Sequence, residues 1–422
     1  MTDYRRFQSG IREDARHAIE NFRDADIVVG IPAYCSDSTL VHVIKVTAAG
    51  LRQFYGNRRS LIMVADGGST DDTRESARSV HEQSFDLGIL VTIYRGVPGK
   101  GSAVRAIFEA ARYLHAPAVA LFDSDLRSIK PSWIRNLIDP ICSGYDFVAP
   151  FYSRYKFDGT ITNTIAYYLV RSLYGVNIRQ PIGGDFGLSS AMISHCLNQD
   201  VWDTDIAKFG IDVWLSITAI VSGFKICQAR LGTKIHGEKD PSEDLGPMFR
   251  EVVGTIFTLI PQHRPFIESV THTRATPIFG DLLPSSPQPF VVSSEPLLAY
   301  FRLGFNNFGS VWKNILEPRD FETVEKLAQL SDQQPFEVPP DVWVRIIYRY
   351  AATFAQAQRQ RIKILDTLVP LYHAKVAALV QALEGHGEAE AEAYYESQAR
   401  NFESQRGYLL SLLHDSQSSS AA

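Results

Sequence analysis

Apolar runs of strand length alternate with amphipathic segments through the first third of the chain. Four runs, at 26–31, 61–65, 89–94 and 118–122, are short and continuous, as buried strands are. The segments between them carry apolar residues on one helical face; after the first run these are Leu40, Val43, Ile44, Ala48 and Leu51. This alternation predicts βαβ units, and therefore a mainly parallel sheet with right-handed crossovers.

The pattern changes twice further along. Strands and helices continue less regularly to about residue 260, a stretch rich in Pro, Ser and Thr follows, and helical segments dominate from Pro296 onward. We therefore predict a Rossmann-like α/β domain plus a C-terminal all-α region. The predicted boundaries are an N-terminal helix at 1–24, two halves of the α/β domain at 25–150 and 151–260, an extended connector at 261–295, a helical region at 296–415 and a disordered tail at 416–422.

Polar motifs follow the predicted strands. They are Pro32-Ala33-Tyr34, Asp66, Lys100, and the pair Asp123 and Asp125. The carboxyl ends of parallel strands share one edge of a sheet, and open α/β sheets bind ligands there. We expect all of these side chains to line that edge.

The acid pair, Asp123 and Asp125, is the most informative motif. Carboxylates are costly to leave unpaired at such an edge. Mg²⁺ and Mn²⁺ take oxygen ligands and commonly bridge to substrate phosphates. The pair therefore favours a metal-assisted site for a phosphorylated substrate. The alternative is that both acids are solvated strand-end or helix-capping residues.

Composition narrows the class of protein. With 422 residues, 45% of them apolar and 21% charged, the chain has the make-up of a globular protein of more than one unit. Its net charge of −5 argues against nucleic acid as the main partner. It has no run of about 18 apolar residues and no apolar signal core at its start, so we expect no membrane span. The four cysteines are scattered, which fits a reducing cytoplasm.

The ordered motifs resemble the nucleotide-sugar half of GT-A glycosyltransferases. The matching segments are Pro32-Ala33-Tyr34, Asp66-Gly67-Gly68-Ser69-Thr70-Asp71, Gly99-Lys100-Gly101 and Asp123-Ser124-Asp125. Downstream segments are similar to those of the retaining enzymes that make glucosyl- or mannosyl-3-phosphoglycerate and glucosylglycerate; they run from Gln180 to Asp185, from Phe209 to Asp212 and from Leu231 to His236. The resemblance covers roughly residues 25–240 and implies the GT-A fold with a nucleotide-diphosphate hexose as donor.

The resemblance also implies a donor site with a bound cation. The donor would contact Pro32, Ala33, Tyr34, Asp66, Gly99, Lys100, Asp123 and Ser124. A divalent cation, Mg²⁺ or Mn²⁺, would be held by Asp125 and His236 and would neutralise the departing diphosphate. Alternatives stay open: Asp66 can cap the helix after it, Lys100 can belong to a simple turn, and His236 can lie in a surface loop. The choice between UDP and GDP, and between glucose and mannose, is also open, with glucose favoured.

The same resemblance implies the residues of the transfer step. Asp212, Asp185 and Lys234 are the predicted catalytic residues, with the acids facing sugar or acceptor hydroxyls and the lysine near the leaving phosphate. The predicted substrate contacts are Gly184, Asp185, Thr160, Thr162 and Asp212. Asp212 as a buried capping acid and Lys234 as an exposed strand lysine are the alternatives. In a retaining transfer of this kind, the protein supplies positioning and charge stabilisation.

One departure from the family bears on the acceptor. Phosphoglycerate-using relatives carry a basic residue where this chain has Thr160, and an Asn where it has Glu238. Both changes remove affinity for a second phosphate. We therefore expect D-glycerate as the acceptor and glucosylglycerate, a compatible solute, as the product. Because Arg154 or Lys156 can still bind a phosphate, 3-phosphoglycerate stays open.

Three other functions compete with this one. An inverting GT-A enzyme would use Asp185 or Asp212 as a general base. A nucleotidyltransferase would share the lysine and the acid-bound metal, but the chain lacks a GxGxR-type loop after its first strand. A degenerate binding subunit is disfavoured by intact Asp123, Asp125 and His236. The C-terminal helices can cover the core, complete the acceptor pocket or form a homodimer.

Overall fold

The computed structural model describes residues 9–82, 87–237, 246–282, 287–331, 333–357 and 359–420. This part of the chain forms two compact units. The first comprises 1–154, 179–238 and 276–287, and the second comprises 155–178, 239–275 and 288–422. Residues 155–178, which the sequence places in the second half of the α/β domain, therefore pack with the C-terminal helices.

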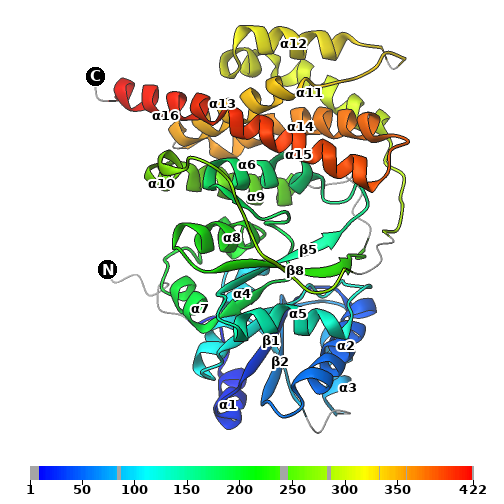
Figure 1. Cartoon of the computed structure of the whole chain (residues 1–422), viewed down its shortest axis with the longest axis vertical. Coiled ribbons are helices and arrows are strands. Elements are labelled where there is room, and N and C mark those ends of the chain that lie inside the picture. Colours follow the sequence, from blue (N-terminus) through cyan, green and yellow to red (C-terminus); the bar gives the residue numbers. More distant parts are fainter. Residues whose placement is uncertain are drawn as a thin grey trace. The chain divides into compact units, whose positions relative to one another are not determined.

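A mainly parallel sheet forms the centre of the first unit (Figure 1). Its strands are β1 (Ile27–Ala33), β2 (Ser60–Asp66), β3 (Gly88–Ile93), β4 (Ala118–Leu121), β5 (Phe147–Ser153), β7 (Gly187–Ser189), β8 (Ile226–Thr233) and β10 (Ile278–Phe279). Within the described residues their order is β10-β8-β5-β7-β4-β1-β2-β3, and β7 runs antiparallel to its neighbours β4 and β5. The predicted α/β class with a mainly parallel sheet is confirmed.

Helices cover both faces of this sheet. One face is covered by α2 (Asp37–Tyr55), α3 (Thr73–Glu82) and α5 (Pro131–Cys142). On the other lie α1 (Glu13–Phe22), α4 (Lys100–Tyr113), α7 (Ser190–Leu197) and α8 (Ile211–Val221), with the short helix η3 (Asp205–Ala207) beside α4. Gly30 of β1 lets α4 approach the sheet, because a Cβ at this position would lie 2.4 Å from a methyl carbon of Ile107.

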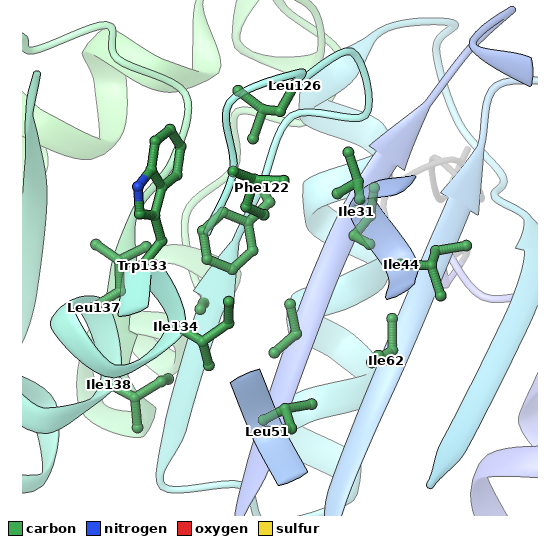
Figure 2. Close-up of a cluster of buried hydrophobic side chains, with 14 of the residues drawn as sticks. Ile31, Ile44, Leu51, Ile62, Phe122, Leu126, Trp133, Ile134, Leu137 and Ile138 are labelled. Carbon is green, nitrogen blue, oxygen red and sulfur yellow. The ribbon is translucent and has the colours of Figure 1, made fainter. Parts of the chain in front are cut away.

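Alternate residues of the strands build the core beneath α2 and α5. Ile31, Ile62 and Phe122 come from the sheet side, and Ile44, Leu51, Trp133, Ile134, Leu137 and Ile138 come from the two helices (Figure 2). All are almost completely buried. Full burial of each such side chain contributes about 1.5–3 kcal/mol. This packing fixes the positions at which β1, β2 and β4 end, and therefore the positions of the motifs that follow them.

In the part of the chain that the structure describes, the second unit is helical apart from the short pair β6 (Val176–Asn177) and β9 (Arg274–Ala275). Its helices are the π-helix η2 (Thr162–Ala166), α6 (Tyr167–Tyr174), α9 (Gly246–Gln262), α10 (Arg264–Ser269), α11 (Ser294–Ile315), α12 (Pro318–Gln329), α13 (Pro340–Gln356), α14 (Arg361–Leu383), α15 (Glu388–Ser404) and α16 (Arg406–Ser420). Buried Arg171 of α6 donates to Glu396 and Glu403 of α15, which ties residues 155–178 to this unit.

The predicted C-terminal all-α region is therefore confirmed. The helix α16 continues to Ser420, through most of the segment predicted as a disordered tail, and residues 421–422 lie outside the described residues. The predicted extended connector contains α10, β9 and β10. Among the described residues, no helix combines the length and the apolar character that crossing a membrane requires.

Candidate active site

Two lysines and three aspartates form a cluster at the carboxyl edge of the sheet. Lys100 Nζ donates to Asp123 Oδ1 at 2.8 Å and to Asp212 Oδ2 at 2.9 Å. Lys234 Nζ donates to Asp123 Oδ2 at 2.8 Å and to Asp185 Oδ2 at 3.0 Å. Asp123 thus lies between two ammonium groups. The sequence placed all five residues at the site, and the structure brings them together.

Short loops at the strand ends hold this cluster. Asp123 follows β4 and its backbone N–H donates to Asp185 Oδ1 at 2.8 Å. Lys234 follows β8 and also donates to Gly183 O at 2.8 Å. Gly184 has a φ of +86°, and a Cβ there would lie 2.3 Å from Asp123 Oδ2. Position 184 therefore requires glycine for two reasons: glycine adopts the left-handed backbone conformation, and it leaves room for the Asp123 carboxylate.

The ion pairs give the three acids different proton affinities. Burial works to raise the pKa of Asp123, but Lys100 and Lys234 outweigh burial and hold that pKa well below its ordinary value. Burial raises the pKa of Asp212, against the opposing effect of Lys100. Burial also raises the pKa of Asp185, against the opposing effect of Lys234. Asp123 is therefore ionised and can only accept hydrogen bonds. Asp212 binds a proton more readily than Asp123 does.

Asp185 is fully buried, which changes its expected role. Its carboxylate accepts from the hydroxyl of Tyr152, from Lys234 and from the backbone of Asp123. A carboxylate with this burial and these partners holds its neighbours in place and presents no oxygen to a sugar hydroxyl. We therefore assign Asp185 a positioning role. Sequence reasoning missed Tyr152 because it lies in the apolar strand β5; the available signal was that a buried tyrosine hydroxyl needs a polar partner.

The loops that carry the predicted metal ligands are joined by hydrogen bonds. Arg127 N donates to Ile235 O at 2.8 Å, and Ile235 N donates to Ser128 Oγ at 2.8 Å. These bonds place the loop of Asp125 beside the segment of His236. Within the described ranges, no group of three or more His, Cys, Asp and Glu side chains forms a complete metal site. Further ligands for a cation at Asp125 and His236 would therefore come from the donor or from water.

The chemistry of these two side chains suits a divalent cation. Arginine can only donate, so the 3.0 Å contact from Arg154 Nη2 to His236 Nε2 requires that Nε2 accepts. The hydrogen of the ring is then on Nδ1, which donates to Gly237 O at 2.7 Å. Metal-binding histidines are commonly oriented in this way, with one nitrogen fixed by a carbonyl and the lone pair of the other available. Asp125 would add the carboxylate oxygen that Mg²⁺ and Mn²⁺ prefer.

The predicted nucleoside edge is formed by the ends of β1 and β2. Ala33 O accepts from Gly67 N at 2.8 Å, and Tyr34 beside it is 65% exposed. Asp66 is fully buried and accepts from Gly68 N at 2.8 Å and from Ser69 N at 3.0 Å. Asp66 thus holds its own turn, and the helix that the sequence allowed it to cap begins only at Thr73. Contact of Asp66 with the donor stays a prediction. Ser124 O accepts from Thr39 Oγ1 at 2.8 Å, and this bond ties the acid loop to α2.

The glycines on either side of Lys100 pack against another segment of the chain. A Cβ at Gly101 would lie 1.9 Å from Ile206 O, and one at Gly99 would lie 2.7 Å from Ala207 O. Gly101 N also donates to Lys208 O at 3.1 Å. The two glycines therefore accommodate the chain's own η3 segment, and the predicted contact of Gly99 with the donor stays a prediction. Lys100 itself is the first residue of α4 and faces the cluster.

The remaining acceptor candidates lie in the second unit. Thr160 Oγ1 is 2.6 Å from the hydroxyl of Tyr372, and Thr162 is buried at the start of η2. Lys156 Nζ donates to Leu383 O at 2.7 Å and to His386 O at 2.8 Å. Glu238 lies outside the described residues. Contact of Thr160 and Thr162 with an acceptor stays a prediction.

Comparison with known proteins gives a family for the first part of the chain. Residues 28–195 match the Glycosyl transferase family 2. A glycosyltransferase of Haloferax volcanii, AglJ, is 38% identical over 87 residues, which are 21% of this chain and 25% of that protein. The chain thus matches a quarter of that relative's length.

Solved structures of glucosyl-3-phosphoglycerate synthase from Mycobacterium tuberculosis are also similar. One, in complex with Mn²⁺, uridine diphosphate and glucosyl-3-phosphoglycerate, is 24% identical with a TM-score of 0.44, over 60% of this chain and 85% of that chain. Another, in complex with Mn²⁺, UDP-glucose and glycerol 3-phosphate, is 22% identical with a TM-score of 0.43, over 60% of this chain and 85% of that one. The family match covers β1 to α7, including Lys100, Asp123, Asp125 and Asp185. Residues 28–195 therefore match a glycosyltransferase family 2 domain, and they supply strands of the mainly parallel sheet.

Proposed function

We propose that this chain moves a hexose, with glucose favoured, from a nucleotide-diphosphate sugar to D-glycerate and retains the anomeric configuration. The observation that carries the proposal is the cluster of Lys100, Lys234, Asp123, Asp185 and Asp212 beside the joined loops of Asp125 and His236. The cluster brings together, at the ligand-binding edge of the sheet, lysine ammonium groups that can bind a diphosphate and aspartate carboxylates that can accept from hydroxyl groups. The four cysteines are free, and we place the reaction in the cytoplasm.

The donor half of the site would work through charge and position. Asp125 and His236 would hold a divalent cation, which neutralises the departing diphosphate when it is bound. Asp123, kept ionised by its two lysines, would accept from ribose hydroxyls. Tyr34 would lie against the base, because its exposed ring at the end of β1 offers a flat apolar surface.

The transfer half would position the two reacting oxygens. The acceptor hydroxyl would form a bond to the anomeric carbon on the face where the bond to the phosphate oxygen breaks, and that phosphate oxygen would take the proton. Lys234 would stabilise the negative charge on the leaving phosphate. Asp212 would accept from sugar or acceptor hydroxyls, and Lys100 would fix its direction.

The contacts of the basic residues support glycerate over 3-phosphoglycerate. Lys156 is bound to two backbone carbonyl groups, and Thr160 stands where phosphoglycerate-using relatives carry a basic residue. A second phosphate would therefore meet fewer available cations here.

One observation favours an inverting transfer as a second candidate. Burial raises the pKa of Asp212, and a raised pKa suits a carboxylate that acts as general base near neutral pH. The two candidates give products of opposite anomeric configuration. Proton NMR of the product formed from an α-linked donor therefore separates them: an α product supports retention, and a β product supports the inverting reaction.

The test of the function is a screen of donors and acceptors with Mn²⁺ or Mg²⁺, read as release of the nucleoside diphosphate. We expect turnover with UDP- or GDP-glucose and D-glycerate, and slower turnover with 3-phosphoglycerate. Asp125→Asn should reduce turnover by at least about 100-fold with the fold intact. Asp203→Asn, which changes an exposed acid, is the matched control and should have no effect. Normal turnover in Asp125→Asn would contradict the metal assignment.

A further inference from the structure

Arg154 occupies the nitrogen through which His236 would bind a cation. Arg154 follows β5, and its Nη2 lies 3.0 Å from His236 Nε2. The other ring nitrogen is directed at Gly237 O, at 2.7 Å. The lone pair of the imidazole therefore points to the guanidinium in the chain without metal.

A guanidinium and a metal ion cannot share one lone pair. A second effect acts in the same direction, because Arg154 already carries a positive charge close to Lys234. The two positive charges are near enough to repel each other. A divalent cation bound at His236 would add further repulsion on Arg154, and this repulsion is strong where water is scarce.

We propose that Arg154 is a placeholder for the divalent cation: it binds His236 in the metal-free chain, and the cation displaces it. The inference rests on the proposed function, since it takes His236 as a metal ligand. Metal binding would thus do two things at once. It would fill the site at Asp125 and His236, and it would release a guanidinium for an anion that arrives at the site.

The released guanidinium has a defined chemical preference. Arginine binds carboxylate and phosphate groups with two parallel hydrogen bonds, and a diphosphate or a hydroxy acid provides such a group. Arg154 would therefore be a positioning residue whose availability depends on the cation. Anion binding would follow cation binding, and the ordered sequence would keep the acceptor from occupying a site that lacks its metal.

The experiment measures binding of Mn²⁺ alone to the full chain by electron paramagnetic resonance, without nucleotide or acceptor. Arg154→Met keeps most of the side-chain length and removes the competing donor. We expect it to bind Mn²⁺ about tenfold more tightly than the wild type, since a hydrogen bond to a charged group no longer has to be broken. Arg154→Lys, which keeps the positive charge and one donating nitrogen, should fall between the two.

The control is the same change made in a chain without the imidazole. In His236→Ala, further change of Arg154 to Met should raise Mn²⁺ affinity by much less than tenfold, because the contact is already absent and only the charge repulsion is relieved. Equal Mn²⁺ affinity in wild type and Arg154→Met would overturn the proposal, as would a gain of the same size in the His236→Ala background. Circular dichroism of each variant verifies that it is folded, and Arg154→Lys provides the same comparison if Arg154→Met does not fold.

A separate assay distinguishes this inference from the function on which it rests. Metal-dependent release of nucleoside diphosphate by the wild type, together with unchanged Mn²⁺ affinity in Arg154→Met, would remove the placeholder and leave the transferase proposal standing. Tighter Mn²⁺ binding in Arg154→Met, together with no turnover on any donor, would support the placeholder role of Arg154 and contradict the transferase proposal.

Discussion

Lys100 Nζ lies 2.9 Å from Asp212 Oδ2, although 112 residues separate the two in sequence. Each side chain is only 12% exposed. The contact joins the first turn of α4 to the first turn of α8, and Asp123 shares the same ammonium. Because buried charges depend on their partners, the cluster acts as one unit, and removal of one member leaves an uncompensated charge on the others.

Lys100→Met should therefore affect both stability and activity. Asp123 and Asp212 would lose a shared partner, which we expect to lower the free energy of unfolding by about 3 kcal/mol. Turnover should fall by at least about 100-fold, because the direction of Asp212 and the charge beside the donor are both lost. Urea denaturation and release of nucleoside diphosphate measure the two effects.

Lys208→Met is the matched control for this change. Lys208 is 38% exposed and its ammonium pairs with Asp205 at 3.4 Å. Its replacement should change stability by no more than about 0.5 kcal/mol, as expected for an exposed pair, and leave turnover unchanged. Similar losses in the two variants would show that charge near η3 matters and that the buried cluster does not.

Gly101→Ala tests the close approach of α4 to η3. A Cβ at 101 would lie 1.9 Å from the carbonyl oxygen of Ile206, which is backbone and cannot turn away. We expect a loss of about 2 kcal/mol in stability, together with reduced turnover, because Lys100 is displaced with its neighbour. The control is Gly407→Ala in α16, where no atom of the described residues lies within 4 Å of the added carbon. Thermal unfolding of the two variants measures the difference in stability. Equal unfolding midpoints would mean that η3 can move away from the added methyl group without cost.

Much of the site was predictable because the ends of the strands determine where its residues lie. Alternating apolar runs and helices determine a parallel sheet, and a parallel sheet puts the residues after its strands on one edge. Asp123 and Lys234 follow β4 and β8 and meet for that reason. Lys100 could be placed by the same logic, since it begins the helix that follows β3.

Features that depend on packing between distant segments were not predictable. Gly99 was predicted to contact the donor, but only the fold shows that η3 lies against Gly99 and Gly101. Tyr152 looks like a core residue until its hydroxyl meets Asp185. Residues 155–178 were assigned to the α/β domain because chain order suggests it, whereas the ion pair of Arg171 with Glu403 ties them to the helical unit.

Tyr34→Ala tests the proposed base contact. Tyr34 is 65% exposed at the end of β1, so its loss should cost little stability. Base–aromatic stacking is worth about 1–3 kcal/mol, so we expect the KM for the donor to rise about tenfold with kcat nearly unchanged. Tyr34→Phe should keep the wild-type KM. Tyr113→Ala, at a 48% exposed tyrosine of α4, is the control, and a rise in KM as large as that of Tyr34→Ala would argue against stacking.

Lys375 of α14 should make the stability of the second unit depend on pH. It is 1% exposed, and among the described residues its ammonium has only the neutral oxygens of Tyr394 and Gln398 as hydrogen-bond partners, at 3.2 and 3.1 Å. Burial lowers the pKa of Lys375 to about 7, with Glu337 acting in the opposite direction. In the unfolded chain the pKa of a lysine is about 10.4.

Between these two values the unfolded chain binds one proton more than the folded chain, so stability should increase with pH from about 7 to about 10. The rise attributable to Lys375 is on the order of 4 kcal/mol at most. Lys375→Met should lack this rise and should be more stable than the wild type at pH 6, because no ammonium has to be buried. Lys363→Met, at an exposed lysine of the same helix, should follow the wild-type curve. Urea unfolding at pH 6, 7, 8 and 9 measures all three chains, and parallel curves for wild type and Lys375→Met would mean that the buried amine keeps an ordinary pKa.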